Sequence, residues 1–149
     1  MLDEPKLVQE HRYPHNIALL GDVRCEGYPT ALATQSHREH ARRVLDILGL
    51  ADEFDIIVTR DDVEHGKPDP EMHLLAAREL GIEPEECLAI EDSPAGVRAA
   101  LAAGMKVIAV TTELTRQKFC DTDLLDRRWV VDDPRTLPSV LRRRLSSDG

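Results

Sequence analysis

The sequence predicts an α/β fold with a mostly parallel sheet. Short apolar stretches that suit strands alternate with amphipathic stretches that suit helices, and this rhythm is typical of parallel sheets. The chain has 149 residues, the length of one domain. Hydrophobic residues make up 42% of it and aromatic residues only 3%, so we expect a core of Leu, Val, Ile and Ala.

Five apolar stretches predict the strands. In chain order they cover residues 31–33, 54–58, 87–90, 107–110 and 129–131. The amphipathic stretches predict helices over residues 17–23, 37–48, 70–80, 94–103 and 137–145. Pro70 and Pro94 suit the first turn of their helices, and glycines at 27, 49, 81 and 104 suit the ends of helices. Ser36 and Glu39 have the spacing of a capping box at the start of the second helix.

Composition narrows the classes of function. The net charge of −9 argues against nucleic acid as a main partner. We expect neither a signal peptide nor a membrane span, because no apolar run approaches the ~20 residues that a span needs. Three cysteines, an odd number without metal spacing, fit a reduced cytoplasmic location.

Two motifs indicate phosphate and metal chemistry. The first, Gly66-Lys67-Pro68-Asp69-Pro70, places a lysine on a rigid turn before a helix. The second ends an apolar strand with the doublet Glu91-Asp92. A fixed ammonium and an acidic pair suit a phosphoryl group held with a hard cation such as Mg²⁺. Asp92 is the better candidate for direct ligation of Mg²⁺, and Glu91 would order water or pair with Lys67.

A third group is expected at the same edge of the sheet. In open parallel sheets, ligands gather at the C-terminal ends of the strands. The hydroxyl of Thr34 and the backbone N–H groups of Gln35 and Ser36 follow a predicted strand and could bind an anion. Taken singly, Thr34 could be a helix cap, Lys67 an exposed turn residue and Glu91-Asp92 an acidic helix start. Their joint order favours a shared site.

Three segments resemble the second, third and fourth motifs of phosphatases in the haloacid dehalogenase (HAD) superfamily, in the branch of beta-phosphoglucomutase and phosphoglycolate phosphatase. These segments are residues 31–36, 66–70 and 90–97. The resemblance implies a three-layer Rossmann-like core, with Thr34 and Lys67 as catalytic residues. It also implies that Thr34, Gln35, Ser36 and Lys67 bind phosphate, and that Asp92, assisted by Glu91, binds Mg²⁺. A small phosphorylated metabolite would be the substrate.

The first motif of that superfamily has no counterpart before Thr34. It is an Asp-x-Asp loop after the first strand, which supplies the nucleophile and the general acid/base. Asp22-Val23-Arg24 carries Arg in place of the second Asp, and only 11 residues separate Asp22 from Thr34. That is too short for a parallel crossover. The cap domain that sets substrate choice is also absent. We therefore interpret residues 1–13 as a tail or a remnant of a cap helix, 14–145 as a partial core and 146–149 as a disordered tail.

The missing strand has a predicted consequence. In the family it lies between the strands that end at Thr34 and at Asp92, so its loss should leave two apolar edges facing an empty slot. We expect the sheet to rearrange, the chain to form a homodimer through the slot, or a separate N-terminal piece to complete it. The leading hypothesis is a Mg²⁺-dependent phosphomonoester hydrolase that is inactive alone. The alternatives are a non-catalytic phosphate- and Mg²⁺-binding or interaction module, and a plain fragment from a shifted start codon.

Overall fold

The computed structural model describes residues 20, 23–112, 115–120 and 124–146. The predicted tail over residues 1–13 lies outside this part of the chain, as do residues 147–149. Of the predicted helix over 17–23, residues 20 and 23 are described, and both are helical. None of the helices described is both long enough and apolar enough to cross a membrane.

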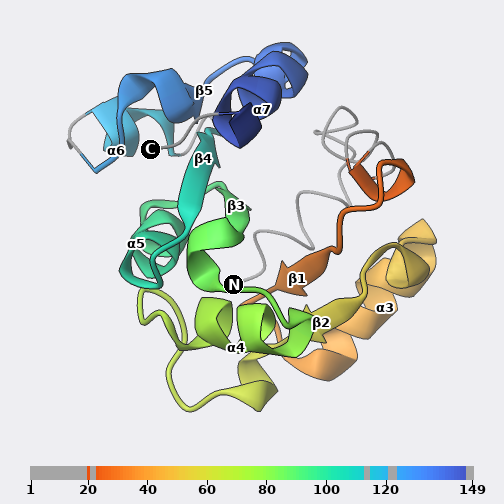
Figure 1. Ribbon diagram of the computed structural model, residues 1–149. Helices are drawn as coiled ribbons and strands as arrows, with labels where there is room; N and C mark the ends of the chain where they lie inside the picture. Colours follow the sequence, from red (N-terminus) through yellow and green to blue (C-terminus); the bar gives the residue numbers. More distant parts are fainter. Residues whose placement is uncertain (1–19, 21–22, 113–114, 121–123, 147–149) are drawn as a thin grey trace.

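The strands pair in parallel and form two separate sheets (Figure 1). In the first sheet, β1 (Ala31–Ala33) pairs with β2 (Ile56–Val58). In the second, β4 (Lys106–Val110) lies between β3 (Leu88–Glu91) and β5 (Val130–Val131). The α/β class and the five strands described here were predicted, with bounds that differ by at most two residues. The second strand begins at Ile56 rather than Phe54.

In the described part of the chain, the helices that follow β1 alternate with the strands. They are α3 (Arg38–Leu48), α4 (Glu71–Leu80), α5 (Pro94–Ala102), α6 (Arg116–Cys120) and α7 (Leu137–Ser146). Single 3-10 turns cover Ala51–Glu53, Arg60–Asp62, Pro84–Glu86, Arg127–Trp129 and Pro134–Thr136. The helix α7 ends at Ser146, one residue after the predicted end of this helix.

The predicted capping box at Ser36 and Glu39 is wrong. The N-cap of α3 is His37, and its side chain makes no capping hydrogen bond. The helix start is held from across the chain instead. The carboxylate of Asp61 accepts the backbone N–H of Arg38 at 2.8 Å and contacts Nδ1 of His37 at 2.7 Å. An acceptor from a distant turn therefore replaces the local one.

The side chains of β4 alternate between two covered faces. Val107 and Ala109 pack with Val97 and other residues of α5. Ile108 packs on the opposite side, in a cluster that includes Leu137 of α7. These residues of β4 are fully buried, as expected for a central strand with helices on both faces. The second sheet thus has its own core.

The two sheets are linked by α4, not by strand pairing. Met72 and Ala76 of α4 pack with Val58 of β2, whereas Ala77 belongs to the cluster under β4 and α5. In the described part of the chain, β1 pairs only with β2, and β3 pairs only with β4. The sheet has not rearranged to bring β1 and β3 together. Among the described residues, each keeps one edge without a partner strand, as expected when the strand between them is missing.

Candidate active site

Lys67 lies where the ends of β1 and β3 approach each other. Its ammonium Nζ donates a hydrogen bond to the backbone carbonyl of Ala33 at 3.0 Å. The same nitrogen lies 3.2 and 3.3 Å from the two carboxylate oxygens of Glu91. Ala33 directly precedes Thr34, and Glu91 directly precedes Asp92. The structure therefore brings the three predicted segments together at the C-terminal ends of the strands.

The turn that carries Lys67 is fixed by Gln35. The side-chain amide of Gln35 accepts the backbone N–H of Lys67 at 3.0 Å and donates to its carbonyl at 3.4 Å. Gly66 allows this approach, because a Cβ at that position would overlap Oε1 of Gln35. Asp69 accepts the backbone N–H of Glu71 at 2.9 Å, so it helps to start α4.

Glu91 is a buried carboxylate rather than an exposed one. Its side chain is 7% exposed and that of Lys67 is 4% exposed. Nε2 of His73 lies 2.8 Å from its second oxygen, Oε2. Burial raises the pKa of Glu91, but the Lys67 charge and the His73 hydrogen bond outweigh it and hold the pKa below its ordinary value of 4.5. Glu91 is therefore ionised at neutral pH, and the predicted pairing with Lys67 is present.

The start of α5 makes room for this carboxylate. Ser93 caps the helix by accepting the backbone N–H of Gly96 at 3.1 Å, and Pro94 occupies the first turn, as predicted. A Cβ at Gly96 would overlap Oε1 and the carboxyl carbon of Glu91. The glycine thus lets the carboxylate pack directly against the first turn of the helix.

The segment after β1 contains an internal hydrogen bond. The backbone N–H of Ser36 donates to Oγ1 of Thr34 at 3.1 Å, and both residues are almost fully buried. This hydrogen bond uses one of the N–H groups that we expected to bind an anion. Contact of Thr34 and Ser36 with phosphate stays a prediction, and it requires this segment to open. Asp92, by contrast, is partly exposed.

His73 is the residue at this site that the sequence motifs missed. It lies on α4 and is buried with Met72, Ala76 and Ala77 on the same face. That spacing places a polar, titratable ring within an apolar stripe. The available signal in the sequence was a histidine within an apolar helical stripe, on the helix that precedes the acidic doublet. The sequence could not show that its partner would be Glu91.

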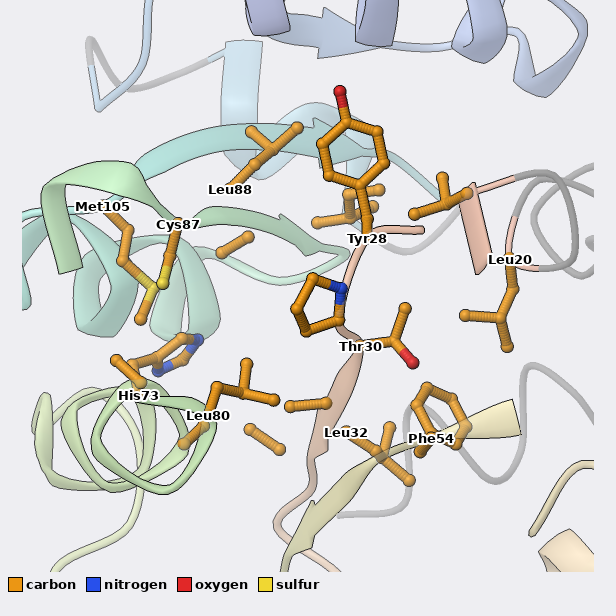
Figure 2. A pocket seen from close by; sticks show the side chains of 18 of the residues that line it. Leu20, Tyr28, Thr30, Leu32, Phe54, His73, Leu80, Cys87, Leu88 and Met105 are labelled. Carbon is orange, nitrogen blue, oxygen red and sulfur yellow. The ribbon is translucent and has the colours of Figure 1, made fainter. Parts of the chain in front are cut away.

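An apolar cavity of about 430 Å³ separates the two sheets. Its long sides are β1 and β3, including Leu32 and Leu88, which Figure 2 shows on opposite sides of the space. Helices contribute the rest of the lining described here. Residues of α4, among them His73 and Leu80, line one part, and residues of α3 and α7, such as Leu45 and Leu141, line another. We call this space the inter-sheet groove.

The described residues offer few ligands for a metal ion. They contain no group of three or more His, Cys, Asp or Glu side chains arranged to hold one. Mg²⁺ commonly takes only one or two protein carboxylates and completes its shell with phosphate and water. Asp92 fits that donor type. The carboxylate of Glu91 is already engaged by Lys67 and His73, which leaves Asp92 as the carboxylate of the doublet that suits such an ion.

Comparison with known proteins points to one family. A family model described as haloacid dehalogenase-like hydrolase matches residues 4–104. Hexitol phosphatase A of Escherichia coli (strain K12) is 40% identical over 112 residues, which are 75% of this chain and 51% of that protein. The chain thus spans about half the length of this curated relative.

Solved structures agree with this comparison. A beta-phosphoglucomutase from Clostridium difficile superimposes with a TM-score of 0.72 at 29% identity, covering 88% of this chain and 55% of that one. CbbY from Rhodobacter sphaeroides, solved in complex with phosphate, gives a TM-score of 0.74 at 29% identity. That match covers 89% of this chain and 60% of CbbY. Each of these two solved structures superimposes on most of this chain. The chain in turn covers little more than half of either structure.

Proposed function

The chain belongs to the haloacid dehalogenase-like hydrolase family, and from this we propose that it is the core of a phosphomonoester hydrolase. The observation that carries the proposal is the buried Lys67 ammonium, held between the end of β1 and Glu91 at the end of β3. A cation fixed at the C-terminal edge of a parallel sheet suits a phosphoryl group. A small phosphorylated metabolite is the proposed substrate, by analogy with hexitol phosphatase A.

Each residue of the site has a proposed role. Lys67 neutralises negative charge that develops on the phosphoryl oxygens in the transition state. Thr34, with the N–H groups of Gln35 and Ser36, binds the same oxygens once the segment after β1 opens. Asp92 is the carboxylate that would hold Mg²⁺. Glu91 fixes Lys67 and balances its charge, which keeps a buried ammonium tolerable.

The nucleophile comes from outside the motifs of this chain. The resemblance implies that an aspartate carboxylate attacks phosphorus, that the P–O bond to the substrate's alcohol breaks, and that the alcohol leaves with a proton from a second acid. Water then attacks the aspartyl phosphate, releasing inorganic phosphate and the free carboxylate. When bound, Mg²⁺ would offset charge on the transferring group. Without the nucleophile, we expect the 149 residues to show no turnover.

We propose that the inter-sheet groove receives the strand that bears this nucleophile. Unpaired strand edges invite another strand, and β1 and β3 offer one on each side of the groove. Leu32 and Leu88 provide apolar walls. A strand four or five residues long, the length of β3 and β4, would end beside Lys67. The sheet would then run unbroken from β2 to β5.

The occupant that fits best is a lone extended segment of a complementing N-terminal chain. Helices line parts of the groove, with α4 on one part and α3 and α7 on another. A second copy could insert β1 or β3 only by carrying its own flanking helices into the same space. A homodimer through the groove is therefore the weaker of the two proposals.

Free thiols at Cys25 and Cys87 are consistent with the proposed cytoplasmic location.

Turnover of p-nitrophenyl phosphate tests the proposal. The chain alone, with and without Mg²⁺, should be inactive. An added segment with an apolar strand followed by Asp-x-Asp should produce Mg²⁺-dependent turnover that Lys67→Met abolishes. Robust turnover by the chain alone, lost in Asp92→Ala, would show that the nucleophile lies within these residues.

A non-catalytic binding module is the second candidate function, favoured by the open groove. In that case the chain binds phosphate and Mg²⁺ weakly, and the groove recruits a partner strand. Calorimetric titration with inorganic phosphate and Mg²⁺, run alongside the turnover assay, separates the two. Binding that is never followed by turnover, even with the added segment, supports the module. Absence of binding to either probe counts against both functions.

A further inference from the structure

One ring nitrogen of His73 makes a hydrogen bond, and the other has no hydrogen-bond partner among the described residues. Nε2 contacts Oε2 of Glu91 at 2.8 Å. Nδ1 is buried and has no hydrogen-bond partner within the described residues. The whole side chain is buried on α4, a helix that also links the two sheets. The ring is therefore held in a fixed place between the helix and the acidic end of β3.

This arrangement selects one form of the imidazole ring. A carboxylate accepts hydrogen bonds, so Nε2 must carry the proton and donate it to Glu91. If Nδ1 were also protonated, a buried N–H would lack a partner, which is costly. The hydrogen bond thus places a proton on Nε2, the nitrogen that faces Glu91. Lys67 and His73 both face the Glu91 carboxylate, and the N–H of His73 fixes its direction.

We infer that His73 is a positioning residue, which fixes the Glu91 carboxylate so that the Lys67 ammonium stays between the ends of β1 and β3. This inference rests on the proposed role of Lys67 in binding a phosphoryl group. Lys67 spans two sheets that are not hydrogen-bonded to each other, so its place depends on the rigidity of both partners. The Ala33 carbonyl is fixed by the backbone, whereas a glutamate side chain has rotatable bonds.

The other contacts of Glu91 cannot supply this rigidity. Gly96 packs against Oε1 through its backbone and has no side chain that could donate to it. Lys67 is the group to be positioned, so it cannot also be the fixed reference. A donor on α4 provides that reference, because helices hold side chains more precisely than loops. Without it, the carboxylate is free to turn and to draw the ammonium away from Ala33.

Three variants of the full 149-residue chain test the inference. His73→Phe keeps an aromatic ring and removes the donor, and His73→Gln keeps an N–H donor of similar reach. His65→Phe is the matched control. His65 lies two residues before Lys67, and its side chain is 66% exposed. Three signals are recorded: the ¹⁵N spectrum of the imidazoles, the ¹³Cε–¹⁵Nζ signal of Lys67, and the affinity for inorganic phosphate.

We expect the His73 imidazole to show a proton on Nε2, the nitrogen that contacts Glu91. The Lys67 signal should shift or broaden in His73→Phe and stay near that of wild type in His73→Gln and His65→Phe. Phosphate affinity should fall about tenfold in His73→Phe, the scale of one hydrogen bond to a charged group, and stay within about threefold in the other two variants. Rescue by Gln separates positioning from mere packing.

The inference is overturned if His73→Phe leaves both the Lys67 signal and the phosphate affinity unchanged. It is also overturned if the wild-type His73 ring carries its proton on Nδ1, a result that does not depend on any variant folding. If His73→Phe fails to fold, the imidazole spectrum and His73→Gln decide. If wild type binds no phosphate, the proposed function fails, and the Lys67 signal still tests His73.

Discussion

The ammonium of Lys67 lies within 3.3 Å of both carboxylate oxygens of Glu91, and this buried ion pair joins the ends of two separate sheets. Glu91 ends β3 in the second sheet, and the same ammonium contacts the carbonyl of Ala33 at the end of β1 in the first. Strand pairing does not connect these two ends. The ion pair thus connects the two sheets and also forms part of the candidate site.

Loss of Lys67 should destabilise the chain strongly. Lys67→Met leaves the buried Glu91 carboxylate without its cation, and removing one partner of a buried pair costs about 3–5 kcal/mol. Urea unfolding followed by circular dichroism measures the free energy of unfolding. The double variant Lys67→Met/Glu91→Leu should recover much of the loss, because both charges are then gone. Equal destabilisation of the single and double variants would contradict a buried pair.

Acid should remove the stabilisation that Glu91 provides. Its pKa is lowered in the folded state, so folding favours the ionised form. The contribution is complete above the unfolded pKa of about 4.5 and is lost as pH falls through the lower folded value. The difference in unfolding free energy between wild type and Glu91→Gln should therefore shrink below about pH 4.5. A difference that stays constant down to pH 2 would contradict this.

Gly96→Ala should destabilise the chain, although alanine is the better helix former by about 0.5–1 kcal/mol. The new Cβ would overlap the Glu91 carboxylate and push it away from Lys67 and His73. Unfolding free energies measure the effect. In a Glu91→Ala background the overlap is absent, so the same substitution should be neutral or stabilising. A Gly96→Ala effect of the same size and sign in both backgrounds would show that the carboxylate does not need this space.

The unpaired edge of β3 in the inter-sheet groove should promote dye binding and self-association of the chain. Ile90 lines the groove and is 42% exposed, whereas Ile47 is 68% exposed and lies outside it. Ile90→Lys should lower the binding of a hydrophobic dye and reduce concentration-dependent self-association, because it places a charge at an unpaired strand edge. Ile47→Lys is the matched control and should change neither. Equal effects of the two substitutions would mean that general surface polarity, not the groove, is responsible.

Local signals explain why most of the fold could be predicted. Pro94 and Ser93 start α5 by interactions within one turn, and Gly81 ends α4 in the left-handed conformation. The motif at Lys67 was predictive because its residues are contiguous. The edges of β1 and β3 could be foreseen because the resemblance showed which strand was absent.

Long-range contacts explain what the sequence could not show. Asp61 lies 23 residues after Arg38, yet it replaces the expected cap of α3. Glu91 was expected near a metal ion, and nothing local indicated that it would turn inward to His73, 18 residues earlier in the chain. Each of these depends on how separate elements pack.

Amide hydrogen exchange at β1 and β3 tests the central claim most directly. The exchange of residues 31–33 and 88–91 is measured with and without an added segment that contains an apolar strand followed by Asp-x-Asp. If one strand completes the sheet between them, exchange should slow in both stretches together. Slowing in one stretch only, or in neither, would contradict the claim that the inter-sheet groove is the place of a single missing strand.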